Sequence, residues 1–142
     1  MPSINLVDLP HAKEDYFIII HYNKSESEAI RTKEKILENG GDVALIKRNI
    51  KSASDASELI LEALSFVKKN SVNQFTLINN ASAFIYDSAE NFEENILDDH
   101  MHANFKIPVL LTKNLHKNLN SSLIGNVINM LDAKLFGLNS VR

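Results

Sequence analysis

The sequence predicts an α/β fold in which a parallel sheet is covered by helices on both faces. Four short apolar runs alternate along the chain with segments whose apolar residues recur at helical spacing. Such alternation is typical of parallel sheets, because each crossover between parallel strands places a helix on one face of the sheet. The 142 residues, of which 44% are apolar, are enough for one domain with a hydrophobic core.

Composition excludes several classes of partner and site. The net charge is −3, whereas a broad nucleic-acid-binding surface needs clustered lysine and arginine. The chain contains no cysteine, so it has no disulfide and no thiolate metal site. No run reaches the roughly 18 apolar residues of a membrane span, and the first residues do not resemble a signal peptide. We therefore expect a cytoplasmic protein without nucleic-acid or membrane partners.

Residues 1–15 have no regular pattern, because Pro10 interrupts the apolar residues from Ile4 to Leu9. We treat them as a separate N-terminal segment and assign residues 16–142 to the domain.

The first strand and helix follow directly. The β-branched and aromatic run Tyr16–Ile20 predicts a buried strand, with His21–Lys24 as its polar exit. Ser25 and Glu28 fit a capping box at the start of a helix, and Gly40 is placed to end that helix in a left-handed conformation. Helical spacing runs through Ala29, Ile30, Lys33, Ile36 and Leu37.

The rest of the chain repeats this alternation. Val43–Ile46 predicts a second strand, and Asp55 and Glu58 predict a helix start whose buried stripe comprises Ala56, Ile60, Ala63, Leu64 and Val67. A long helical pattern over residues 91–117 contains Pro108, which should kink it. Gly125–Leu131 predicts a fourth strand.

The organising stretch is Phe75–Phe84, in which a third strand ends in Asn79-Asn80-Ala81-Ser82. Small residues there let a flat ligand approach the backbone, and the amides can bind loops or that ligand. In open α/β sheets, ligands bind outside the carboxyl ends of the strands. The alternative interpretation is an ordinary turn, since asparagine and serine are common turn residues.

Four local features together resemble the short-chain dehydrogenase/reductase family. They are His21–Lys24, Asn79–Ser82, Asn104 in the long helix, and Asn129–Asp132. The spacing from the Asn-Asn-Ala-Ser element to Asn104, and on to the Gly-x-Val-Ile-Asn strand, is similar to the middle section of that family. His-Tyr-Asn after the first strand and the aspartate after Asn-Met-Leu are most similar to its pteridine-reductase-like branch.

The resemblance implies an incomplete Rossmann-like, doubly wound parallel sheet with about four strands and three main helices. It also implies NADPH as the cofactor and reduction of a carbonyl or a pterin-type ring. Asn104 matches the asparagine that positions a water in the family's proton relay, and Asp132 falls where most members have the catalytic serine. Cofactor-binding roles are implied for Tyr22, Asn23, Lys24, Ser25, Asn49, Asn79, Ala81 and Ser82.

Each of these residues also has a structural interpretation. Asn104 could bind only a loop carbonyl, Asp132 could cap a turn, and Lys24 could be a solvated residue at a helix start. His100 and His102 are two residues apart on a helix and face different directions, so we expect no metal site.

Two parts of the family pattern do not occur in these 142 residues: the Gly-rich turn that holds the pyrophosphate, and the catalytic Tyr-x-x-x-Lys pair. The resemblance therefore predicts a truncated or split family member that is inactive alone. Two alternatives stay open. One is a non-catalytic nucleotide- or partner-binding module, and the other is one half of a split oxidoreductase completed by a second chain.

The family's central first strand is also missing from the pattern, which leaves its two neighbours without a shared partner. We expect the strand at 16–20 to pair directly with that at 75–79. The alternatives are that Ile4–Leu9 or a second polypeptide fills the position. An exposed apolar flank would then favour self-association.

Overall fold

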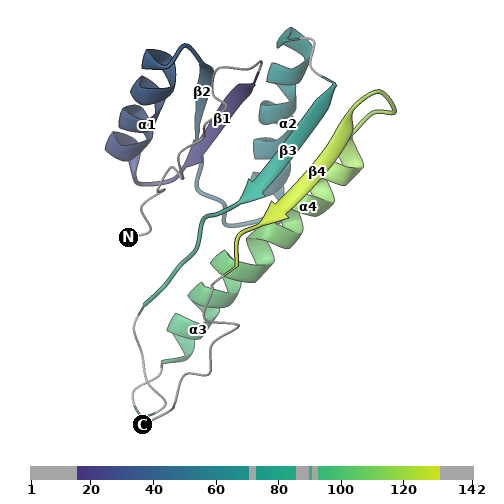
Figure 1. Ribbon diagram of the computed structural model, residues 1–142. Coiled ribbons are helices and arrows are strands. Elements are labelled where there is room, and N and C mark those ends of the chain that lie inside the picture. Colours follow the sequence, from purple (N-terminus) through teal and green to yellow (C-terminus); the bar gives the residue numbers. More distant parts are fainter. Residues whose placement is uncertain (1–15, 71–72, 86–89, 91–92, 132–142) are drawn as a thin grey trace.

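The computed structural model describes residues 16–70, 73–85, 90 and 93–131. Strands and helices alternate in this part of the chain, and the strands pair in parallel (Figure 1). The predicted α/β fold, with a partial Rossmann-like sheet, is confirmed. In chain order the elements are β1 (Phe17–Tyr22), α1 (Glu26–Glu38), β2 (Asp42–Lys47), α2 (Ala53–Asn70), β3 (Gln74–Asn79), α3 (Glu94–Met101), the π-helical segment η1 (His102–Lys106), α4 (Ile107–Asn118) and β4 (Ile124–Asn129).

The four strands form two separate pairs. β1 pairs with β2, and β3 pairs with β4. The expected direct pairing of the first strand with the third is therefore wrong, because β1 and β3 share no ladder of hydrogen bonds. Side chains connect the pairs instead: Ile19 of β1 and Phe75 of β3 pack against one hydrophobic cluster built largely from α2. The alternative in which Ile4–Leu9 fills the gap concerns residues outside the described part.

The β1–β2 pair is covered on both faces. Successive side chains of a strand point to opposite faces. Ile20 packs with Ala29 and Ile36 of α1 on one face, whereas Ile19 packs against the α2 cluster on the other. Ile46 of β2 belongs to the α2 side and is only 1% exposed. This pair is therefore the better-buried half of the molecule.

Helix α2 carries the predicted buried stripe, and α1 carries only part of its own. Four of the five stripe residues predicted on α2 are buried, and Val67 packs against the same cluster. On α1, Ala29 and Ile36 are buried but Ile30 and Leu37 are exposed. The difference has a packing cause: α1 lies on one side of β1 and β2, whereas α2 also contacts α4 and the β3 side.

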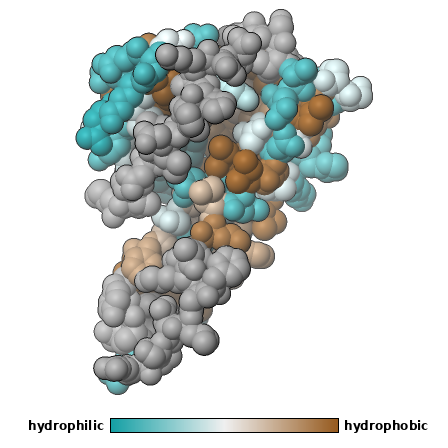
Figure 2. Space-filling view, viewed as in Figure 1, coloured by the Kyte–Doolittle hydropathy of each residue, from teal (hydrophilic) through white to brown (hydrophobic). Residues whose placement is uncertain are grey.

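Among the described residues, helices cover the β3–β4 pair on one face only. Phe75 and Leu77 pack against the cluster to which α4 contributes Leu111 and Leu115. The opposite face carries Ile78, Ile124 and Ile128, with exposed fractions of 55%, 63% and 46%. No described helix covers this face, which lies toward the viewer in Figure 1 and shows brown patches in Figure 2. We call it the open face of β3–β4.

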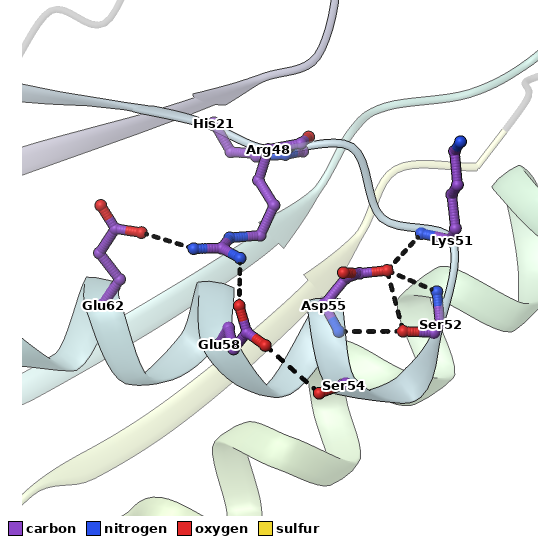
Figure 3. Close-up of polar contacts among 8 residues, drawn as sticks. All are labelled: His21, Arg48, Lys51, Ser52, Ser54, Asp55, Glu58 and Glu62. Atoms are coloured by element: carbon purple, nitrogen blue, oxygen red, sulfur yellow. Dashed lines mark hydrogen bonds and ion pairs between the residues drawn. The ribbon is translucent and has the colours of Figure 1, made fainter.

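The two helix starts differ from the expectation. Ser25 is the N-cap of α1, but its side chain makes no capping hydrogen bond, so the predicted capping box is wrong. The capping box forms instead between Ser52 and Asp55, so α2 begins before the predicted start (Figure 3). The Asp55 carboxylate accepts hydrogen bonds from the Ser52 amide at 2.9 Å and the Lys51 amide at 3.0 Å. These bonds, with the Lys51 amide contributing most, hold the pKa of Asp55 below its ordinary value.

Gly40 ends α1 as predicted. Its φ of 79° lies in the left-handed region, which glycine adopts without a Cβ clash. The Gly40 amide donates to the Leu37 carbonyl at 2.9 Å, and the Gly41 amide donates to the Ile36 carbonyl at 3.0 Å. This pair of bonds is a Schellman motif, which satisfies carbonyls that the helix itself leaves free.

The long helical pattern is one helical path with a π-helical middle. α3, η1 and α4 follow one another without a break, and the Ile107 amide donates to the His102 carbonyl five residues earlier. Pro108 lies in the first turn of α4, directly after this widened segment. Proline lacks an N–H and crowds the preceding turn, so the predicted irregularity takes the form of a π-helical segment.

The boundaries of two strands also differ from those predicted from the sequence. His21 and Tyr22 were expected in the polar exit but belong to β1, because both pair with β2 residues. The fourth strand begins at Ile124 and ends at Asn129, before Met130. In both cases the ladder to the neighbouring strand, rather than local polarity, sets the boundary.

Candidate functional site

Each strand ends in a residue with polar atoms, and these four ends carry most of the predicted site. The last residues are Tyr22, Lys47, Asn79 and Asn129. Within each parallel pair the carboxyl ends lie together, so Tyr22 is opposite Lys47 and Asn79 is opposite Asn129. In open α/β sheets this edge is where ligands bind.

Tyr22 belongs to a small charged cluster. Its hydroxyl donates to the Glu26 carboxylate at 3.0 Å, and the same carboxylate pairs with the Lys47 ammonium at 2.9 Å. Lys47 also lies 5.9 Å from the centre of the Tyr22 ring. The hydrogen bond from Lys47 is the main reason that the pKa of Glu26 is below its ordinary value. The cluster neutralises Glu26 next to the predicted cofactor residues.

Asn23 and Asn49 link the exits of β1 and β2. The Asn23 amide nitrogen donates to the Asn49 side-chain oxygen at 3.2 Å, and both side chains are exposed. Lys24 is exposed and its ammonium forms no ion pair within the part of the chain that the structure describes. Ser25 follows at the start of α1 with a hydroxyl that is not used in capping. These four predicted residues therefore lie together at one edge.

Asn79 joins the two strands of the second pair. Its side-chain nitrogen donates to the Asn129 side-chain oxygen at 2.8 Å, and its carbonyl accepts from the Met130 amide at 3.0 Å. Ala81 and Ser82 follow as exposed residues of the segment after β3. Asn129 was quoted only as part of the resemblance, and its direct bond to Asn79 was not predicted.

Asn104 binds the segment that follows Ser82. Its side-chain oxygen accepts from the Ala83 amide at 2.7 Å, and its side-chain nitrogen donates to the Ala83 carbonyl at 2.9 Å. The residue lies in η1, where the helix is widened. Side-chain bonding to a loop, which was the structural interpretation, is therefore observed. The same two bonds also place Asn104 next to the predicted cofactor edge.

His100 was missed as a site residue. Its Nε2 accepts a hydrogen bond from the Ile85 amide at 2.9 Å, so it binds the same segment as Asn104. The two side chains are four residues apart, a spacing that places them on one face of a helix. That spacing was the available signal, but the sequence argument compared His100 only with His102. The His102 ring instead contacts the Ile50 carbonyl at 3.1 Å.

A second polar cluster at the end of β2 is engaged in structural contacts. The Arg48 guanidinium pairs with Glu58 at 2.6 Å and with Glu62 at 3.1 Å (Figure 3). His21 binds the Arg48 carbonyl at 2.9 Å, and burial lowers the pKa of this histidine. Because two carboxylates already neutralise Arg48, Lys24 is the better candidate for binding an anion at this edge.

One predicted site residue cannot be placed: Asp132, the predicted catalytic position, lies outside the described residues. Among residues that the structure does describe, no three histidine or acidic side chains form a group suited to a metal ion. None of the described helices has both the length and the apolar character needed to cross a membrane. No hydrogen bond among the described residues connects the polar residues after β1, which are Asn23, Lys24 and Ser25, with Asn79 or with Asn104.

Solved structures that are similar to this chain include reductases. One similar structure is that of FolM alternative dihydrofolate reductase 1 from Brucella canis complexed with NADP; the match includes 90% of this chain, at 26% identity and a TM-score of 0.73. Another is that of the promiscuous reductase LugOII, which catalyses keto-reduction in lugdunomycin biosynthesis; the match includes 87% of this chain, at 25% identity and a TM-score of 0.71. A short-chain dehydrogenase/reductase from Serratia marcescens, at 21% identity, 80% coverage and a TM-score of 0.65, shares the fold.

The chain spans about half of these relatives: 50% of FolM, 49% of LugOII and 44% of the Serratia enzyme. No curated protein sequence matches it. The model of the short chain dehydrogenase family, however, matches residues 10–132, which include all four strands and every described site residue. This chain therefore belongs to the short-chain dehydrogenase/reductase family.

Proposed function

We propose that this chain forms the part of an NADPH-dependent reductase that borders the cofactor, and that the reductase acts on a carbonyl or a pterin-type ring. The observation that carries the proposal is the pair of bonds between Asn104 and Ala83. They join the helix that bears the expected relay asparagine to the strand exit that bears the expected cofactor residues. Similarity to FolM complexed with NADP and to a keto-reducing enzyme supports the cofactor and the reaction class.

The residues at the exit of β1 fit the 2′-phosphate of NADPH. Lys24 supplies an exposed cation, while Asn23 and Ser25 supply neutral hydrogen-bonding groups at the N-terminus of α1. A helix N-terminus favours anions, and a lysine with hydroxyl and amide groups suits a phosphate. Glu26 would oppose an anion, but Lys47 pairs with it. Asn79, Ala81 and Ser82 would border the rest of the nucleotide.

The bound nucleotide would supply the hydride. Asn104 would hold its part of the helix in register with the strand exit, and Asp132 would stand at the catalytic position. The phosphate cradle and the proton donor would come from polypeptide other than these 142 residues, either a longer form of this chain or a second chain. We expect no turnover from the 142 residues alone, because losing one such group costs several kcal/mol of transition-state stabilisation.

A second candidate is a non-catalytic module that binds a nucleotide or a protein partner. The open face of β3–β4 favours it, because Ile78, Ile124 and Ile128 leave an apolar surface that another polypeptide could cover. β1 and β3 also each have one strand edge without a partner strand among the described residues. The same surfaces could accept a complementing chain or a second copy.

The test is a circular dichroism melt of the chain with NADPH, with NADH and without nucleotide. A ligand that binds only the native state raises the melting temperature. We expect NADPH to raise it more than NADH. Lys24→Glu should weaken NADPH binding by at least about tenfold, since hydrogen bonds to charged groups contribute about 1.5–3 kcal/mol.

Lys113→Glu on α4 is the matched control, because it makes the same change of charge at another exposed position. A melting temperature unmoved by NADPH would contradict cofactor binding by this chain. An equal response of the Lys24→Glu and Lys113→Glu variants would contradict the assigned phosphate site. A response to NADPH together with turnover by the 142 residues would contradict the need for further polypeptide.

A further inference from the structure

Two side chains of the α3–η1 helix bind the backbone after β3 at three points. Asn104 makes two hydrogen bonds with Ala83, and His100 accepts one from the Ile85 amide. Between the two anchored residues, Phe84 places its ring parallel to that of His100, with the centres 6.5 Å apart and the planes at 6°.

The distance between Ala83 and Ile85 along the segment is similar to the distance between His100 and Asn104 along the helix. In an extended chain, residues two apart project their backbone polar groups from the same edge and are about 6.6 Å apart. Four residues along an α-helix rise about 6 Å and return to the same face. The path from His100 to Asn104 enters the widened η1, and both side chains still contact the same segment. His100 and Asn104 thus present side-chain groups to Ala83 and Ile85 much as a neighbouring strand would present its backbone.

The direction of the His100 bond fixes its proton state. The Ile85 amide can only donate, so Nε2 must carry a lone pair, and the ring must be neutral with its proton on Nδ1. A protonated ring has two donors and no acceptor, so it cannot make this bond. His102 behaves in the opposite way, because its Nε2 faces the Ile50 carbonyl and must donate. Protonation leaves that bond intact.

We propose that His100 is a positioning residue that, only in its neutral form, holds the segment from Ala83 to Ile85 extended against the helix. The segment directly follows Asn79–Ser82, so its position sets how the predicted cofactor edge lies relative to Asn104. In this respect the inference rests on the proposed function. The contact between His100 and the segment does not depend on a bound cofactor.

Among the described residues, the charged and titratable groups nearest to His100 in the sequence lie on its own helix. Asp98 and Asp99 precede His100 on α3, and His102 and Lys106 follow on η1. The segment from Asn80 to Ile85 contains no titratable side chain. Protonation of His100 would therefore act on the segment by removing the acceptor for Ile85, without a change in charge on the segment itself.

The test is amide hydrogen exchange at Ile85 in the 142-residue chain, expressed as a protection factor at about pH 8 and about pH 5, a range in which imidazoles ordinarily change charge. In the wild type we expect protection to fall by about fivefold or more at the lower pH, beyond any change at Ala83. His100→Gln keeps a neutral acceptor near the Nε2 position, so its protection should not depend on pH. His100→Ala should have low protection at both pH values.

The nitrogen-15 shift of the ring gives an independent signature. In the neutral rings, Nε2 should be unprotonated in His100 and protonated in His102, so protonation of a ring should change the Nε2 signal of His100 but not that of His102. His116→Ala, which alters an exposed histidine on α4, is the control and should match the wild type.

Equal Ile85 protection in the wild type at both pH values would overturn the proposal, and so would a His100→Gln variant that loses protection at about pH 5. Because these outcomes need no nucleotide, they are separate from failure of NADPH to bind.

Discussion

The two strand pairs have nearly the same local design and a very different environment. β2 and β4 are each the second strand of a parallel pair, and both carry isoleucine at the fifth of six positions. Ile46 of β2 is 1% exposed, whereas Ile128 of β4 is 46% exposed. The cause is the number of covering layers, because in the described part of the chain α1 and α2 enclose the first pair, whereas helices cover only one face of the second. An apolar strand pattern therefore specifies a strand without specifying its burial.

The strongest test of this comparison replaces the two matched isoleucines. Ile46→Ala should lower the free energy of unfolding by about 2–5 kcal/mol, because it leaves a cavity in the core shared by both pairs. Ile128→Ala should cost less than about 1 kcal/mol, since its side chain is half in solvent. Urea denaturation of both variants measures the difference. Equal losses would show that the open face of β3–β4 is buried in solution, for example by a second copy.

A second test examines the covered face of the β3–β4 pair. A Cβ added at Gly125 would lie 2.4 Å from the Leu119 Cδ1 atom, so Gly125→Ala forces this side chain to move. We expect a loss of about 1 kcal/mol, at the low end of overpacking, because Cδ1 is the far end of a flexible side chain but Leu119 also packs against the core cluster. The neighbouring Asn126→Ala on the open face should change the free energy of unfolding by no more than about 0.5 kcal/mol. If both variants were neutral in denaturation, the packing of α4 against β4 would be looser than described.

The smallest expected effect is a pH dependence of stability that arises in the first pair. Burial between the strands and α2 lowers the pKa of His21, with the nearby Arg48 charge acting in the same direction and the bond to the Arg48 carbonyl opposing it. The unfolded chain therefore binds a proton at higher pH than the folded one. This contribution to stability is fully present above the unfolded pKa and is lost as the pH falls toward the folded pKa.

We thus expect the wild type to lose stability in denaturant titrations as the pH falls below about 6.5, the ordinary value for histidine. His21→Gln should remove that part of the loss. His116→Gln on α4 should leave it unchanged. A wild-type slope that persists in the His21→Gln variant would assign the pH dependence to other groups.

The candidate site likewise has features that follow from local sequence and features that depend on packing between distant elements. The positions of Asn23, Lys24 and Asn49 after recognisable strands were predictable, whereas the Asn23–Asn49 hydrogen bond was not predicted and the role of these residues toward a cofactor stays a prediction. The Asn79–Asn129 bond follows from parallel pairing in register, which the sequence suggested but did not specify. The roles of His100 and Asn104 toward the segment after β3 depend on which face of the helix meets that segment. Local sequence does not contain this information, since it arises from packing between elements far apart in the chain.

By itself the sequence determined the type and order of the elements, the buried stripe of α2 and the end of α1 at Gly40. These features depend on local apolar spacing and on the freedom of glycine at positive φ, which act over a few residues. Only the tertiary structure decided that the strands form two pairs and that β1 extends through Tyr22. The capping box of Ser52 and Asp55 is a local contact three residues apart that was not predicted from the sequence. Strand pairing and burial are set by which distant surfaces meet, because each strand edge and each apolar face is satisfied only by a partner outside its own segment.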